Sequence, residues 1–185
     1  MNTQSTYVTV IVGAFLFLVG ACSPEVAHAP AVQNAHSSVS YYHELQHERY
    51  KNAHIYAEQY DISPDLALKI YDASVVHGLD SDLLFELIQE ESSFRPSAYS
   101  HAAARGLMQV RIRTARIFDP DVTPTELHEV DTNLRIGCQY LVELLERYPT
   151  QKLALLAYNR GPTRVDRIVG SGGDPSNGYA KSILE

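Results

Sequence analysis

Residues 83–110 read LLFELIQEESSFRPSAYSHAAARGLMQV, and this stretch decides the fold. Asp80 and Ser81 supply a helix N-cap before it, and Leu83, Leu84, Leu87 and Ile88 then recur at helical spacing. On a wheel of about 100° per residue, Glu91 lies within about 10° of the mean direction of those apolar side chains. A helix that packs them into a core therefore turns one carboxylate toward the core as well.

Glu91 differs in this respect from the other carboxylates of the predicted helix. On the same wheel Glu90 lies about 90° away from the apolar direction, and Glu86 about 130° away. A carboxylate turned toward a core needs a partner, or it keeps its proton with a raised pKa. Glu91 is therefore a candidate acid, although pairing with an arginine or capping a neighbouring turn would equally satisfy it.

The residues that follow form a long ordered pattern. It comprises Glu91-Ser92-Ser93-Phe94, Pro96, Ala98, Ser100, Gly106-Leu107-Met108-Gln109 and Thr114-Ala115. The pattern resembles the catalytic motifs of the soluble-lytic-transglycosylase-like (SLT) family, which cleaves peptidoglycan and is related to goose-type lysozymes. Three later segments resemble further motifs of that family in the family's order: Asn133–Leu141 (NLxxGxxYL), Ala157–Gly161 (AYNxG) and Tyr179–Leu184.

The sequence departs from the family pattern at two places. Ala103-Ala104 stand where Gly-Ala is usual, and Arg111-Ile112 replace the Met-Pro that commonly follows the glutamine. The second change removes a methionine whose usual role is substrate contact, and it sets a cation near the expected cleft. Neither change affects Glu91.

The resemblance implies a mostly α, single lysozyme-like domain over residues 62–185 and a lytic transglycosylase activity without a cofactor. Glu91 would be the general acid and then the base in cleaving the β-1,4 bond, leaving a 1,6-anhydromuramic product. The cleft residues implied by position are Ser100, Gln109, Tyr158, Asn159 and Tyr179. Core packing is the alternative role for Tyr158, and a helix C-terminal turn is the alternative for Asn159.

Two other functions remain open on the same scaffold. A lysozyme-like hydrolase would use water and a second carboxylate, for which Asp119, Asp121, Glu126 and Asp131 are candidates by composition alone. A non-catalytic wall-binding lipoprotein is the other, and the intact Glu91 motif argues against it. The net charge of −7 argues against nucleic acid as a partner and indicates that a shaped cleft must recognise an anionic wall polymer.

Local signals divide the rest of the domain into helices. Ser63-Pro64 predicts a helix start and His77-Gly78 its stop, with a further helix beginning near Gly106. Asp131 is the expected cap of the next helix, and no alternating strand pattern is present. The expected core face of the first of these helices is Leu66, Leu68, Ile70, Val75 and Val76, and the stripe of the Asp131 helix is Leu134, Cys138, Leu141, Leu145 and Tyr148. Thr150 opens another helix, followed by short ones at 162–168 and 179–184.

The N-terminus predicts a lipoprotein. Residues 1–21 read as a signal peptide whose apolar run is too short for a comfortable membrane span and ends in a lipobox-like sequence before Cys22. Residues 22–40 are small and Pro-containing and predict a flexible tether, followed by a helical segment at 41–61. We expect a lipid on Cys22 and a place in the outer membrane facing the periplasm; an ordinary cleaved signal or a short anchor is the alternative.

A zinc-protease signature also occurs, in the sequence HELQH. His43 and His47 have the spacing of two zinc ligands, and Glu44 that of the base. No Gly-x-x-His continuation follows, and the preceding residues do not predict a buried apolar helix. We therefore interpret this segment, with His54, as a solvated helix face and expect no catalytic metal.

Overall fold

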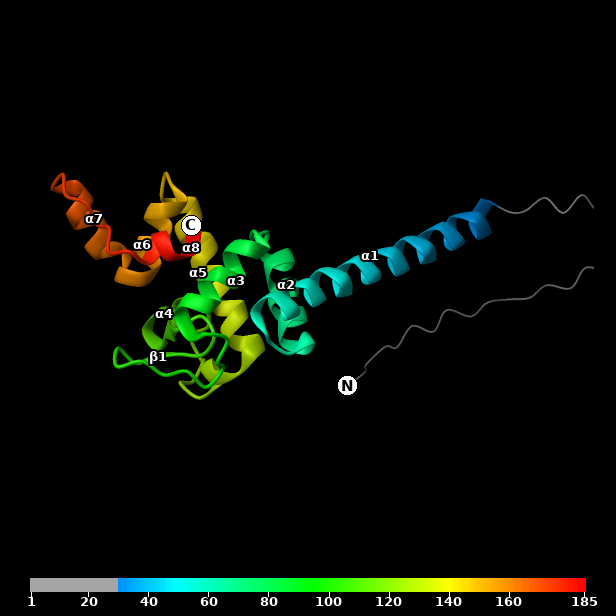
Figure 1. Ribbon diagram of the computed structural model, residues 1–185, viewed down its shortest axis with the longest axis horizontal. Helices are drawn as coiled ribbons and strands as arrows, with labels where there is room; N and C mark the ends of the chain where they lie inside the picture. The colour runs from blue at the N-terminus through cyan, green and yellow to red at the C-terminus, as the bar shows by residue number, and fades with distance from the viewer. Residues whose placement is uncertain (1–29) are drawn as a thin grey trace, which may run out of the picture. The chain divides into compact units, whose positions relative to one another are not determined.

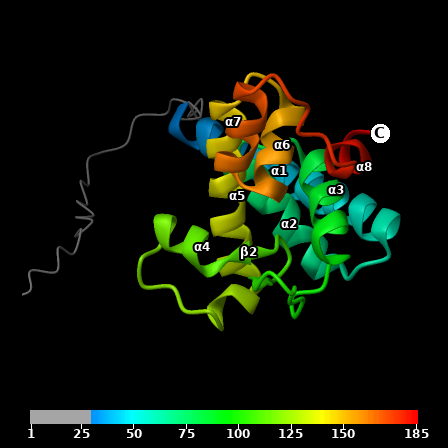
Figure 2. The same ribbon diagram turned by 90° about the vertical axis from the view of Figure 1, so that its left-hand side faces the viewer.

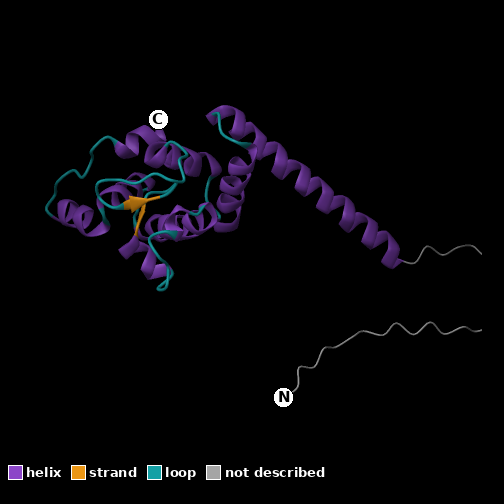
Figure 3. Ribbon diagram, turned by 90° about the horizontal axis from the view of Figure 1, so that it is seen from below, coloured by secondary structure: helices purple, strands orange, loops and turns teal. Residues whose placement is uncertain are grey.

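The computed structural model describes residues 30–185, with side chains from residue 41 onward except at residue 42. The chain divides into two units, Met1–Val39 and Ser40–Glu185. The elements are α1 (Pro30–Tyr60), α2 (Pro64–His77), α3 (Ser81–Ser92), β1 (Ala104–Arg105), β2 (Val110–Arg111), α4 (Ile112–Phe118), the 3-10 helix η1 (Glu126–His128), α5 (Val130–Arg147), α6 (Gln151–Arg160), α7 (Pro162–Gly170) and α8 (Tyr179–Leu184). The mostly α prediction is confirmed for the described residues (Figures 1 and 3).

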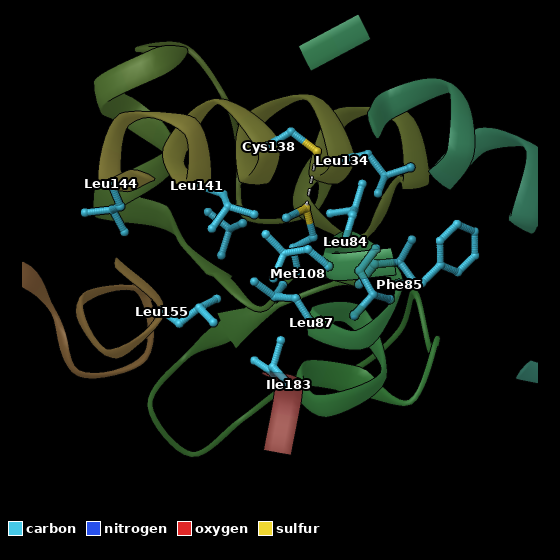
Figure 4. Packing of buried hydrophobic residues seen from close by; sticks show 14 of the residues in the cluster. Leu84, Phe85, Leu87, Met108, Leu134, Cys138, Leu141, Leu144, Leu155 and Ile183 are labelled. Carbon is cyan, nitrogen blue, oxygen red and sulfur yellow. Dashed lines mark hydrogen bonds between the residues drawn. The ribbon is translucent and has the colours of Figure 1, made fainter. Parts of the chain in front are cut away.

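The core of the second unit contains buried side chains of both α3 and α5. Leu84, Leu87 and Ile88 of α3 are fully buried, as their helical spacing predicted. Helix α5 contacts α2, α4 and α6, and Figure 2 shows it running through the middle of the domain. In Figure 4 Cys138 of α5 points at Met108, and their sulfur atoms lie 3.9 Å apart. Cys138 is thus the buried apolar-like residue that the stripe predicted.

The predicted helix starts and stops are largely confirmed because capping is local chemistry. The side-chain oxygens of Ser63, Asp80 and Thr150 each accept a hydrogen bond from a first-turn backbone N–H, at 3.3, 3.0 and 3.3 Å. Gly78 ends α2 with φ +64°, a conformation that favours glycine. Asp131 is an exception, since α5 begins at Val130 and the Asp131 carboxylate pairs with Lys69 at 2.6 Å.

The prediction of a helix near Gly106 is wrong. The chain there forms a short antiparallel hairpin, with Ala104 opposite Arg111 and Arg105 opposite Val110, and α4 begins only at Ile112. Gly106 has φ +76°, and a Cβ on it would lie 2.3 Å from Asn133 Nδ2. A contact with a helix 25 residues or more downstream therefore sets this turn, and no local pattern could reveal it.

The predicted core face of α2 is also partly wrong. Val75 and Val76 are 62% and 78% exposed, whereas Ile70 is buried. Ser74 takes the buried place instead, because its hydroxyl is 2.7 Å from that of Ser81 and bonds the Tyr71 carbonyl at the same distance. Serine is smaller than valine, so α2 can approach the start of α3 closely at this position. The two hydrogen bonds satisfy its buried hydroxyl.

The tether predicted for residues 22–40 differs from the structure over residues 30–40, the part of it that the structure describes. From Pro30 onward the backbone is helical and continuous with the predicted helical segment. Proline is favoured in a first helical turn, and the alanines that follow are strong helix formers. Residues 30–40 can therefore extend the helix. Cys22 and the predicted signal peptide lie outside the described residues. Among residues 30–185, no helix is long and apolar enough to cross a membrane.

Candidate active site

Glu91 lies in the last turn of α3, where the helix passes from the core to a cavity. Ser93 and Phe94 adopt left-handed conformations, with φ of +48° and +57°, and turn the chain away directly after it. The Tyr179 hydroxyl of α8 donates a hydrogen bond of 2.5 Å to Glu91 Oε1. Two segments 88 residues apart therefore fix this one carboxyl.

The surroundings of Glu91 favour its protonated form. Burial raises the pKa of Glu91 to about 7, since a carboxylate loses hydration there. The Tyr179 hydrogen bond opposes this rise in pKa, and the neighbouring Glu90 charge adds to it. Glu90 itself is exposed, as the helical wheel predicted. A carboxyl with a pKa near 7 can give up a proton and take one back near neutral pH.

A cavity of about 800 Å³ opens beside Glu91. Its walls include Ser100, Gln109, Tyr158 and Asn159, so four of the predicted cleft residues gather around the predicted acid. Tyr179 is not part of the wall. It is buried, and it holds Glu91 from behind.

Ser100 and Gln109 partly serve the hairpin. The Ser100 hydroxyl accepts a hydrogen bond from the Ala104 backbone N–H at 3.1 Å. Gln109 Nε2 donates to the Gly106 carbonyl at 3.0 Å, from a backbone with φ +47°. These contacts orient both side chains at the cavity wall.

Tyr158 and Asn159 come from the C-terminal end of α6. The Tyr158 hydroxyl donates to the Met108 carbonyl at 2.8 Å, and its ring centroid lies 5.2 Å from that of Tyr140. Tyr158 thus packs against the core and lines the cavity at once. Asn159 is exposed and accepts a hydrogen bond from Asn177 Nδ2 at 2.9 Å, which links α6 to the segment before Tyr179.

A family model named the transglycosylase SLT domain matches residues 69–178, which is more than half of the chain and includes the cavity walls. The chain belongs to this family.

The curated proteins similar to this chain include bacterial lytic murein transglycosylases. The chain is 35% identical over 123 residues to membrane-bound lytic murein transglycosylase C of Cronobacter sakazakii, covering 57% of this chain and 33% of the relative. Soluble lytic murein transglycosylase of Salmonella typhimurium is 30% identical over 119 residues, covering 53% of this chain and 18% of the relative. The chain thus spans at most about a third of the length of these relatives.

Solved structures agree with the lysozyme-like helical fold that the sequence predicted. An inactive glutamate-to-glutamine mutant of lytic transglycosylase Slt from Pseudomonas aeruginosa superposes with TM-score 0.53 at 25% identity, covering 62% of this chain and 21% of that one. The 70 kDa soluble lytic transglycosylase of Escherichia coli gives TM-score 0.52 at 25% identity, covering 66% and 21%.

Asn133 organises this SLT domain in a way that sequence reasoning missed. Its fully buried amide donates to the Arg105 and Leu127 carbonyls at 2.8 and 2.7 Å and accepts from the Met108 N–H at 2.8 Å. Gly137, one turn later, leaves room for Met108, whose sulfur would lie 2.4 Å from a Cβ there. The NLxxG motif was the available signal, because it contains both residues.

The candidates for a second carboxylate do not reach the cavity wall of the SLT domain. Asp119 pairs with Arg135 at 2.6 Å, Asp131 with Lys69, and Glu126 accepts from Thr123 at 2.7 Å. Besides Glu91, the carboxylate among the described wall residues is that of Glu143, which is exposed. Among the described wall residues, the site therefore presents one carboxyl that is withdrawn from solvent, the half-buried Glu91.

The zinc-protease signature lies outside the SLT match. His43, Glu44 and His47 are exposed on α1, which confirms the solvated helix face. His54 pairs with Glu58 at 3.3 Å on the same helix. Over the part of the chain with described side chains, no three His, Cys, Asp or Glu residues converge in a way that could hold a metal ion.

Proposed function

We propose that this chain is a peptidoglycan lytic transglycosylase that cleaves the β-1,4 bond between N-acetylmuramic acid and N-acetylglucosamine. The observation that carries the proposal is the half-buried Glu91 carboxyl, whose pKa burial raises to about 7, beside a cavity of about 800 Å³. Such a carboxyl is the acid that a glycosidic oxygen needs on leaving. The murein transglycosylase names of the relatives, and the inactive glutamate-to-glutamine Slt mutant, support the same chemistry.

The first step protonates the leaving group. Glu91 gives its proton to the glycosidic oxygen as the bond to C1 of muramic acid breaks, and the carboxylate that remains faces positive charge developing at C1. The Tyr179 hydroxyl then donates to a charged carboxylate, and this hydrogen bond is stronger than one to the neutral acid. Tyr179 thus stabilises the state that follows proton transfer.

The second step needs a nucleophile, and the substrate supplies one. The C6 hydroxyl of the same muramic acid attacks C1, and Glu91 takes its proton, which restores the acid and closes a 1,6-anhydro ring. Tethering of this kind supplies about 7–11 kcal/mol of a barrier, so a second carboxylate is not required. Among the described residues of the cavity wall, Glu91 is the one carboxyl that is withdrawn from solvent, which fits this mechanism.

Product mass tests the proposal. Digestion of purified peptidoglycan should give muropeptides that end in 1,6-anhydro-N-acetylmuramic acid, lighter by one water than hydrolysis products and unreactive toward borohydride. Mainly reducible termini would make the protein a lysozyme-like hydrolase. Absence of soluble products from the wild type would favour a non-catalytic wall-binding lipoprotein.

We further propose that the protein is a lipoprotein anchored through Cys22, in the outer membrane and facing the periplasm. The lipobox-like residues before Cys22 support this, as does the membrane-bound description of its relatives. Cells expressing Cys22→Ala should release the protein into the soluble periplasmic fraction. Failure of the wild type to incorporate labelled fatty acid would overturn the anchor.

A further inference from the structure

The cavity that contains Glu91 has a charge opposite to that of the chain. Six of the chain's fifteen Lys and Arg residues line it, against two of its twenty-two Asp and Glu residues. The whole chain has a net charge of −7. The six are Arg111, Arg113, Arg147, Arg160, Arg164 and Arg167. Such segregation concentrates a positive potential where the substrate binds.

Two of these arginines have protein partners. Arg147 pairs with Asp166 at 2.5 Å, and Arg160 donates to the Pro175 carbonyl. Within residues 43–185, no hydrogen bond or ion pair engages the side chains of the other four, and all four are exposed. Guanidinium groups without a protein partner can bind carboxylates with two parallel hydrogen bonds.

The four unpaired arginines come from two walls of the cavity. Arg111 ends β2 and Arg113 lies in the first turn of α4, and Arg164 and Arg167 share one face of α7 at a three-residue step. Figure 2 shows α5 running between α4 and α7. Burial raises the pKa of Tyr140, a residue of the cavity wall, and the charges of Arg113 and Arg111 oppose that rise, which places both cations near this ring.

The arginines and the acid are electrostatically separate. A nearby cation would lower the pKa of Glu91, yet the groups that set this pKa are burial, Tyr179 and Glu90. The arginines therefore leave the proton of Glu91 in place. Their positive charge is available to a ligand and is not needed for the chemistry.

We infer that these arginines bind the carboxylates of the peptide stems, so that the preferred substrate is a glycan strand that carries stems with free carboxylates. This inference rests on the proposed function. The stem is attached through a lactyl group to muramic acid, the same sugar whose C1 is cleaved at Glu91. The strand's sugars are uncharged, whereas the short stems contain acidic residues and a terminal carboxylate, so the stems are the anionic part that this cavity matches.

The test compares three substrates. They are strands with native stems, strands whose stem carboxylates have been converted to amides, and strands from which an amidase has removed the stems and whose exposed lactyl carboxylates have then been converted to amides. We expect the wild type to cleave the native strands with a kcat/KM about tenfold higher than the other two, since each exposed charge-assisted contact is worth a few-fold. The preference should shrink in 0.5 M salt, where charges are screened beyond about 4 Å.

A double variant with a matched control locates the effect. Arg164→Gln with Arg167→Gln should reduce the preference for native over amidated stems severalfold, with an unchanged melting temperature because both side chains are exposed. Arg116→Gln removes an exposed arginine of α4 outside the cavity and should leave the preference as in the wild type. Arg111→Gln with Arg113→Gln tests the other wall in the same way.

The outcomes separate this inference from the proposed function. Equal cleavage of native and amidated strands, or an unchanged preference in both double variants, would overturn the arginine site while leaving a transglycosylase. Absence of cleavage of all three strands would overturn the proposed function. Soluble fragments with native or amidated stems then still test the arginine site, because their Kd values for the wild type and the variants need no catalysis.

Discussion

The two ends of the cavity handle charge in opposite ways. At the α3 end, the half-buried Glu91 carboxyl is held by the Tyr179 hydroxyl and has a pKa raised to about 7. At the α7 end, Arg164 and Arg167 are exposed and have no partner among the described residues. Burial changes the chemistry of a group, whereas exposure preserves its charge for a ligand. The core therefore positions the candidate acid, and the arginines proposed to bind the stems are side chains that the fold does not need.

The largest expected effect separates Glu91 from its neighbour. Glu91→Gln should lower kcat by about 10²–10⁴-fold, the usual loss for a positioned general acid. Glu90→Gln is the matched control, because the same change on an exposed residue should leave kcat close to that of the wild type. Release of soluble muropeptides measures both, and the reverse ranking would show that the wrong carboxylate was assigned.

The second-largest expected effect concerns Asn133, which holds the hairpin. Asn133→Ala leaves the Met108 N–H and the carbonyls of Arg105 and Leu127 without their partner, and should lower the free energy of unfolding by about 3 kcal/mol. Asn52→Ala removes one half-buried contact with Tyr71 and should cost under about 1 kcal/mol. Urea unfolding compares the two; equal losses would mean that Asn133 does not hold the hairpin.

The raised pKa of Glu91 also predicts that the free energy of unfolding falls as the pH rises. With a folded pKa of about 7 and an ordinary value of 4.5, Glu91 binds more protons folded than unfolded between these pH values. Its contribution to stability therefore falls as pH rises from 4.5 to 7, by up to about 3 kcal/mol. Glu91→Gln should be more stable than the wild type at pH 8 and similar at pH 4, as thermal unfolding at both values would reveal. An equal melting temperature at pH 8 would contradict a buried, strained carboxylate.

The smallest effect concerns the hydroxyl behind the acid. Tyr179→Phe removes the donor that lowers the pKa of Glu91, so the alkaline limb of the pH–rate profile should move to higher pH. Since one hydrogen bond is worth about 1 kcal/mol, kcat at pH 7 should fall roughly fivefold. Tyr56→Phe, whose hydroxyl instead contacts Asp82, should leave the profile in place. A profile that shifts equally in both variants would remove Tyr179 from the site.

The sequence predicted the features that depend on contacts between residues close together in the chain. The caps at Ser63, Asp80 and Thr150 were predictable because donor and acceptor lie three residues apart. The direction of Glu91 followed from helical period alone, and the cleft residues followed from family motifs.

The parts that sequence reasoning missed depend on contacts between distant segments. The hairpin at 104–111 needs Asn133, the exposure of Val75 and Val76 depends on how α2 meets its neighbours, and the arginines gather only when α7 folds back toward α4. The exchange of Met for Arg111 was visible in the sequence and did predict a cation near the cleft. The other three arginines without a protein partner among the described residues, Arg113, Arg164 and Arg167, belong to no recognisable motif.

The central claim, that burial turns Glu91 into an acid that works near neutral pH, can be measured directly. In protein labelled with ¹³C at glutamate carboxyls, the signal that disappears in Glu91→Gln belongs to Glu91, and its shift can be followed from pH 3 to 9. A midpoint of about 7 is expected for this signal. A midpoint for Glu91 near the ordinary 4.5 would contradict it, because the carboxyl would then carry no proton to give.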